Sequence, residues 1–280
     1  MVSHGWYLLA PFRWSREELV LRRPEIVGGT ARDLEIAHEG DELVVRGAAM
    51  TPELRAKLGR MFQLDVDLGE FVALARATAS HAWVERAGFG RLLCGSTLFE
   101  DVVKIILTTN TTWRQTMRMC ALLVEKCGPR TPLGFAAFPE PAGVVHFSPA
   151  ELQEDCRLGY RAKSIHAVAT LFRDGDPSPP PALATPELFA HYQKLPGIGP
   201  YGAAHLLAMD GRHDFIAVDT EFRRFVRDRY HGGRHVSEKT MLRRYARWGR
   251  WKYLAYWSEL WESVAEALQP LEKGGQKRGQ

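Results

Sequence analysis

Long apolar segments are missing from this sequence of 280 residues. No stretch approaches the roughly 18 uncharged apolar residues that a membrane-spanning helix requires. The opening letters MVSHGWYLLAPFRW also lack the basic start and long apolar run of a signal peptide. We therefore expect no membrane partner and a cytoplasmic location. Hydrophobic residues still make up 45% of the chain, which suffices for a buried core in one large domain or two modest ones.

Cysteine is scarce as well. The four cysteines are Cys94, Cys120, Cys127 and Cys156. Their spacing matches neither the paired Cys-x-x-Cys pattern of a zinc site nor a compact cluster-binding run. We expect reduced, mostly buried thiols and no bound metal ion.

The charge of the chain is nearly balanced, at a formal +4, but it is unevenly distributed. From Asp219 to Lys252 there are eleven Lys or Arg residues against four acidic residues. Such a local excess of positive charge suits a surface that faces a polyanion, since phosphate contacts supply most non-specific affinity for nucleic acid. The alternative on charge alone is a solvated helical face.

Two kinds of pattern define the expected fold. Residues 33–38 and 42–46 are short β-type runs around a Gly turn, which predicts a β-hairpin near the N-terminus. From Met50 onward apolar residues recur at helical spacing, and capping boxes are expected at Thr97–Glu100 and Ser148–Glu151. We expect a mostly α chain with a small antiparallel sheet domain at 1–60 (α+β), a helical domain at 61–270 and a disordered tail at 271–280.

The stretch LPGIGPYGAAH, residues 195–205, predicts a tight turn between two helices. A helix is expected from Pro186 to Gln193, and Pro200 suits the first turn of the next helix. We expect Gly197 and Gly199 to take positive φ and to expose backbone amides that can hold an anion such as a phosphate. The alternative is that the glycines serve only to turn the chain.

An acidic residue follows this turn. The apolar run Phe215–Val218 ends at Asp219, just before the basic segment. A carboxylate beside a phosphate-binding turn would repel a nucleic-acid backbone, so its presence favours chemistry over affinity. The alternative for Asp219 is a helix N-cap.

Together these two motifs carry a family resemblance. LPGIGPYGAAHLL followed by AVDTEFRRF resembles the signature of the helix-hairpin-helix DNA glycosylase superfamily, which contains endonuclease III, 3-methyladenine glycosylase and 8-oxoguanine glycosylase. Residues 62–67, 99–110 and 158–163 also resemble stretches of the latter two branches. The resemblance implies the HhH-GPD glycosylase fold with two helical subdomains and a monomer that acts on double-stranded DNA containing a damaged base, at a bacterial nucleoid or in a nucleus.

The resemblance also implies chemical roles. Asp219 would stabilise the positive charge that develops on the sugar as the N-glycosidic bond breaks, and would orient or deprotonate a water molecule. Bifunctional members carry a Schiff-base lysine where this sequence has Tyr201, and a phenol cannot form an imine. We expect a monofunctional DNA glycosylase of base excision repair, acting on an alkylated or otherwise modified purine. An 8-oxoguanine-type glycosylase and a non-catalytic damage-binding protein of the same fold are the alternatives.

Further residues are assigned by the same resemblance. The base pocket is expected to include Tyr201, His205, Tyr256 and Trp257. The DNA-binding residues are expected to be Gly197, Gly199, Asn110, Arg223 and Arg224. Alternatives stay open here: Asn110 could mark a plain helix break, His205 could be structural, and the C-terminal aromatics could be core.

The expectation for cofactors follows from the cysteines. The iron–sulfur members of the superfamily carry four cysteines after the catalytic segment, whereas this sequence has none after Cys156, so no cluster is expected. The resemblance allows a monovalent cation at the hairpin carbonyls.

Overall fold

A computed structural model describes residues 4–40, 42–175, 177–180 and 182–268. The tail expected at 271–280 lies outside the described residues. Contacts divide the chain into two compact units. Unit 1 comprises Met1–Asp65 and Leu92–Asp210, and unit 2 comprises Val66–Arg91 and Gly211–Gln280.

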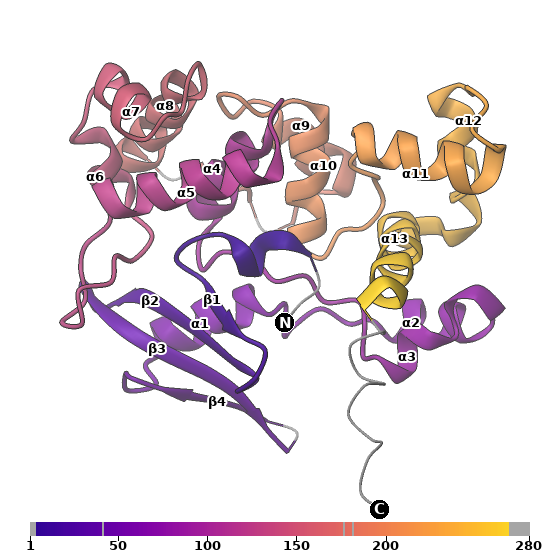
Figure 1. Ribbon diagram of the computed structural model, residues 1–280, viewed down its shortest axis with the longest axis horizontal. Coiled ribbons are helices and arrows are strands. Elements are labelled where there is room, and N and C mark those ends of the chain that lie inside the picture. Colours follow the sequence, from indigo (N-terminus) through magenta and orange to yellow (C-terminus); the bar gives the residue numbers. More distant parts are fainter. Residues whose placement is uncertain (1–3, 41, 176, 181, 269–280) are drawn as a thin grey trace, which may run out of the picture. The chain divides into compact units, whose positions relative to one another are not determined.

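Unit 1 contains the sheet and most of the helices (Figure 1). Its elements are η1 (Gly5–Leu8), β1 (Arg13–Ser15), β2 (Val20–Val27), β3 (Thr30–Glu39), β4 (Glu42–Arg46), α1 (Pro52–Met61), α4 (Leu98–Thr108), α5 (Trp113–Cys127), α6 (Pro141–Val145), α7 (Pro149–Asp155), α8 (Arg161–Asp174), α9 (Thr185–Tyr192) and α10 (Pro200–Met209).

The sheet is antiparallel with strand order β1-β2-β3-β4. The expected β-hairpin is confirmed, with Glu35 opposite Arg46 and His38 opposite Leu43. Leu34 and Ile36 of β3 are buried while the residues between and beside them are not, which is the period-two alternation of a strand with one covered face. Helix α1 lies against the sheet, where Lys57 donates to the carbonyl of Ile26 in β2.

Both expected capping boxes begin a helix, but only one is reciprocal. At α7 the Ser148 hydroxyl accepts the amide of Glu151, and the Glu151 carboxylate accepts the amide of Ser148. At α4 the Thr97 hydroxyl accepts the amide of Glu100, but the Glu100 carboxylate accepts the amide of Ser96 instead of completing the box. Glu100 departs from the expectation because its side chain belongs to a buried ion cluster.

The ion cluster lies in the core of unit 1. The Glu100 carboxylate accepts from Arg23 at 2.7 Å and from Lys104 at 2.7 Å, and all three side chains are at most 1% exposed. Burial alone would raise the pKa of Glu100, but the two neighbouring cations outweigh it and hold this pKa below its usual range. Because removing one member of a buried pair leaves an uncompensated charge, the cluster fixes β2 against α4.

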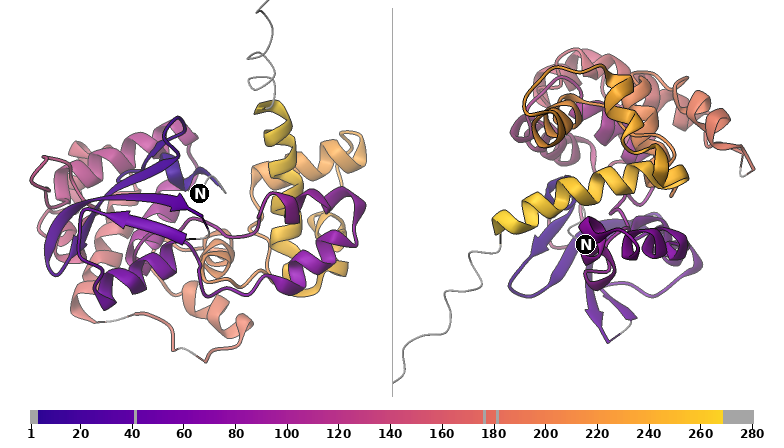
Figure 2. Two further views of the ribbon diagram at one scale, coloured as in Figure 1. Left: turned by 90° about the horizontal axis from the view of Figure 1, so that it is seen from below. Right: turned by 90° about the vertical axis from the view of Figure 1, so that its right-hand side faces the viewer.

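Unit 2 is helical. Its elements are α2 (Gly69–Arg76), η2 (Ala79–His81), α3 (Trp83–Arg86), α11 (Thr220–His231), α12 (Glu238–Arg243), η3 (Ala246–Trp251) and α13 (Lys252–Leu268). Figure 2 shows α2 and α3 beside α13, and the buried His81 ring contacts the carbonyl of Ala255 in α13. His213 is 1% exposed and stacks on Trp251 and Tyr253 with ring centroids 5.6 and 6.1 Å away.

The described residues therefore confirm the expected fold class: a mostly helical chain with a small antiparallel sheet near its N-terminus. No helix in this part of the chain is long and apolar enough to cross a membrane. The four thiols are free and buried, as the spacing predicted.

Candidate DNA-binding and catalytic residues

The turn in LPGIGPYGAAH is a hairpin between α9 and α10 in unit 1. The side chains of Leu195 and Ile198 are buried and attach the hairpin to the core of unit 1, while both glycines are exposed. Gly197 has the expected positive φ, at +81°. The expectation for Gly199 is wrong: its φ is −95° and its backbone is extended, because it serves as the N-cap of α10.

The two glycines are needed for different reasons. A Cβ on Gly197 would lie 2.8 Å from the Cβ of Ser164 in α8, so the hairpin approaches α8 too closely for a side chain. A Cβ on Gly199 would meet nothing within 4 Å. Gly199 therefore leaves the start of α10 uncovered, where amides and the helix dipole favour an anion.

Tyr201 and His205 lie one turn apart on α10 and form part of an aromatic stack. His205 is 5.8 Å from Tyr201 and 5.4 Å from Trp6 of η1, and Trp6 stacks in turn on His4 at 4.8 Å between centroids. Burial lowers the pKa of His205 to about 4. At neutral pH the stack therefore presents an uncharged imidazole beside the half-buried Tyr201.

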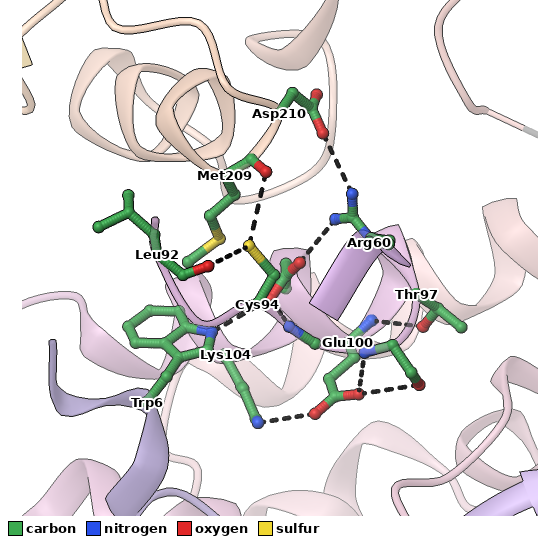
Figure 3. A network of polar contacts seen from close by, with 12 residues as sticks. Trp6, Arg60, Leu92, Cys94, Thr97, Glu100, Lys104, Met209 and Asp210 are labelled. Carbon is green, nitrogen blue, oxygen red and sulfur yellow. Dashed lines mark hydrogen bonds and ion pairs between the residues drawn. The ribbon is translucent and has the colours of Figure 1, made fainter. Parts of the chain in front are cut away.

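A polar network holds Trp6 and the end of α10 together (Figure 3). The Trp6 indole donates to Asp101 at 3.1 Å, and Arg60 joins Asp101 and Asp210 at 2.6 and 3.1 Å. The Tyr192 hydroxyl donates to the other oxygen of Asp210. These contacts tie the C-terminal ends of α9 and α10 to each other and to α1 and α4.

Asn110 lies at an exposed turn between α4 and α5. Its φ is +45°, and its side-chain amide donates to the Tyr160 hydroxyl at 3.2 Å. Arg161 donates to the carbonyls of Thr109 and Asn110, which satisfies the end of α4. Asn110 thus marks a helix break and also presents its side chain at the surface. The helix break is therefore compatible with the predicted role in DNA binding, which stays a prediction.

Asp219 is the N-cap of α11 in unit 2. Its Oδ1 accepts the amide of Phe222 at 2.7 Å. The side chain is half buried, and this burial raises the pKa of the carboxyl above its ordinary value in spite of the amides that favour its charged form. Asp219 is therefore a helix N-cap, as one alternative predicted. A catalytic role for the same carboxylate stays a prediction.

Arg223 and Arg224 are exposed on α11. Each is held by a nearby acid: Arg223 by Glu238 at 2.9 Å and Arg224 by Glu221.

The C-terminal aromatics differ in exposure. Tyr256 is 2% exposed and packs edge-on against Phe222 and Tyr245 in the core of unit 2. Trp257 is half buried and stacks on Tyr253 at 5.8 Å and 13°. A role for either residue in a base pocket stays a prediction, and Trp257 has the more accessible ring.

Sequence reasoning missed the residues that support these side chains. Trp6 and Tyr160 contact His205 and Asn110 across long stretches of chain. No local pattern marks Trp6, whereas Tyr160 lies in the stretch 158–163 that carries part of the family resemblance. Within the described residues no group of three or more His, Cys, Asp or Glu side chains is arranged to hold a metal ion.

The hairpin between α9 and α10 and the carboxylate at the start of the basic helix α11 are the two features on which the resemblance to helix-hairpin-helix glycosylases rests. Residues 103–250, more than half of the chain, match the family described as HhH-GPD superfamily base excision DNA repair protein. The chain belongs to this superfamily of base excision repair glycosylases.

Solved structures share the fold. The 3-methyladenine DNA-glycosylase from Archaeoglobus fulgidus is similar with a TM-score of 0.74 and 22% identity, over 94% of this chain and 92% of that one. An 8-oxoguanine glycosylase/lyase from Clostridium acetobutylicum, in complex with DNA containing cytosine opposite 8-oxoG, has a TM-score of 0.71 and 19% identity, over 95% and 93% of the two chains. No curated protein sequence matches the chain.

Proposed function

We propose that the protein is a monofunctional DNA glycosylase that releases a damaged purine by hydrolysis. One observation carries the proposal: the half-buried Asp219, whose pKa burial raises, stands at the head of a basic helix in a chain that has Tyr201 at the Schiff-base lysine position. Neither related fold decides the substrate, since one neighbour is a 3-methyladenine DNA-glycosylase and the other an 8-oxoguanine glycosylase/lyase.

The proposed reaction needs only a carboxylate and water. As the bond between the base and C1′ breaks, the base leaves with the bonding electron pair and positive charge develops on the sugar. The Asp219 carboxylate stabilises that charge and accepts a proton from the water that attacks C1′. A raised pKa makes the carboxylate a better proton acceptor, and the departing base takes up a proton from solvent.

The proposed DNA contacts begin at the hairpin. A backbone phosphate would be held at the exposed start of α10, which Gly199 leaves open. Asn110, supported by Tyr160, would contact the gap that an extruded nucleotide leaves. Tyr201, next to the neutral His205, would stack on the extruded base, and an aromatic surface of this kind favours an electron-poor, alkylated purine.

The test of catalysis is Asp219→Asn. Asn and Asp are comparable N-caps, so the variant should fold and bind DNA normally. It should lose on the order of 10²-fold or more in single-turnover base release, because it lacks the charge. Duplexes containing 3-methyladenine, 1,N6-ethenoadenine, hypoxanthine, 8-oxoguanine or uracil would identify the substrate. Wild-type rates in the variant would contradict the assignment of Asp219, and no release from any lesion would favour the non-catalytic alternative.

The test of the monofunctional assignment is reductive trapping. Incubation with lesion-containing DNA and borohydride should give no covalent adduct and no strand cleavage, because Tyr201 cannot form an imine. The Tyr201→Lys variant is the comparison, because it places a primary amine, which can form an imine, at the same position of α10. A stable adduct with the wild-type protein would show that another lysine acts as the nucleophile.

A further inference from the structure

Helices α11 and α12 lie beside each other in unit 2 (Figure 1). A groove of about 440 Å³ is lined by residues of both helices. Thr220, Arg223, Arg224 and Arg227 line it from α11, and Val236 and Met241 line it from the other side. Met241 is buried and Val236 half buried, whereas the arginines keep 41–61% of their side chains exposed. The groove therefore combines an apolar surface with a row of guanidinium groups.

The row follows from helical spacing. Residues 220, 223, 224 and 227 recur at intervals of three and four and so share one face of α11. This face starts beside Asp219, the N-cap of the same helix. Eight residues at 1.5 Å each place Arg227 about 12 Å along the axis from Asp219, which is the rise of roughly three to four nucleotides in one strand of B-DNA.

The three arginines form exposed ion pairs, and their guanidinium groups remain accessible to a phosphate. Arg223 pairs with Glu238 at 2.9 Å, Arg227 pairs with Asp228 at 2.7 Å, and Arg224 pairs with Glu221. Exposed ion pairs of this kind contribute little to stability, so exchanging a carboxylate for another anion costs little. Guanidinium groups also bind phosphate oxygens in a bidentate manner, so a phosphate is a strong competitor for them.

We propose that this α11–α12 groove is a binding site for the phosphates of a DNA strand, formed by unit 2 alone and distinct from the hairpin of unit 1. The strand that presents its sugar to Asp219 continues along α11, with phosphates at Arg223 and Arg227 and apolar sugar faces toward Val236 and Met241. This inference rests on the proposed function, because it takes the same DNA substrate and extends its contacts beyond the reacting nucleotide.

The experiment measures binding without requiring catalysis. The affinity of the full chain for a fluorescent, undamaged duplex is measured by anisotropy between about 50 and 200 mM salt, the range over which phosphate contacts dominate the salt dependence. The Arg223→Gln/Arg227→Gln double variant should lose roughly tenfold in affinity. The negative slope of the logarithm of the association constant against log salt should become shallower by about 0.9 for each of the two phosphate contacts.

Arg250→Gln is the matched control. Arg250 belongs to the same basic segment, has an exposed side chain and makes a comparable ion pair with Glu70 at 2.8 Å, but it does not line the groove. This variant should keep the wild-type slope. In the opposite direction, Glu238→Gln should tighten binding because it removes a carboxylate from the groove. Thermal melts of all variants establish that each one is folded.

Two results would contradict the proposal that DNA phosphates bind in the α11–α12 groove. One is a wild-type salt slope in the double variant. The other is an equal loss of DNA affinity and salt slope in Arg250→Gln, which would indicate a general electrostatic attraction. Either result would leave the proposed function intact if Asp219→Asn still abolished base release. Conversely, an absence of base release from every lesion would contradict the enzymatic proposal. The salt slopes of DNA affinity would still show whether phosphates bind in the α11–α12 groove.

Discussion

Asp219 has a structural role as a helix cap, and the proposed reaction gives the same carboxylate a chemical role. Its Oδ1 caps α11, and half burial raises its pKa. A carboxylate just before a predicted helix can cap that helix or take part in catalysis, so the sequence alone supports both roles. What the structure adds is a held orientation and a physical reason for a stronger base.

The pH dependence of base release follows from this raised pKa. Protonated Asp219 cannot stabilise positive charge on the sugar, so the single-turnover rate should fall tenfold per pH unit below the pKa of Asp219. That limb should lie above the ordinary aspartate value of about 3.9. Rates are measured on saturating DNA, with circular dichroism in the same buffers to exclude unfolding. A flat profile down to the ordinary aspartate value would contradict the role.

At the scale of elements, the hairpin was predictable and its details were not. Pro200, the two glycines and the flanking apolar residues identify helix, turn and helix from local rules. The expectation of positive φ at Gly199 was wrong for a local reason, because a residue that precedes a proline and caps a helix favours extended backbone. Glu100 could not be predicted locally, because its partner Arg23 lies on a distant strand and diverts its side chain from the capping box.

The two glycines provide a matched pair of variants. Gly197→Ala should lower the free energy of unfolding by roughly 1–3 kcal/mol, because its φ is positive and its Cβ would collide with Ser164. Gly199→Ala should stay within about 1 kcal/mol of wild type, as expected of an N-cap change. It should nevertheless weaken DNA binding, because the added methyl covers the start of α10.

Urea unfolding and anisotropy separate these effects. Unchanged stability in Gly197→Ala would refute the close packing on α8. Wild-type affinity in Gly199→Ala would remove the hairpin from the proposed DNA contacts.

For the molecule as a whole, buried histidines predict sensitivity to acid. Burial lowers the pKa of His205 in unit 1 to about 4 and that of His213 in unit 2 to about 3. The unfolded chain binds these protons near pH 6.5, before the folded chain does. Stability from both residues is therefore complete above pH 6.5 and is lost as the pH falls from 6.5 toward 4 and 3.

His213→Phe tests this prediction. The ring nitrogens of His213 have no hydrogen-bond partner among the described residues, so an apolar ring should fit between Trp251 and Tyr253 at little cost near neutral pH. The loss of stability between pH 6.5 and 4.5, measured by urea midpoints, should be smaller in the variant than in wild type. An identical loss would show that other groups govern acid unfolding.

Two sets of contacts to α8 within unit 1 bear on the proposed DNA contacts. Gly197 packs on Ser164, and Arg161 holds the carbonyls of Thr109 and Asn110; both residues belong to α8. The hairpin and the Asn110 turn therefore both pack on α8, which fixes the spacing between these two proposed DNA contacts. Where that spacing differs from the phosphate spacing of a straight duplex, the DNA must bend to meet both, so sequences and lesions that make DNA easier to bend should be bound in preference.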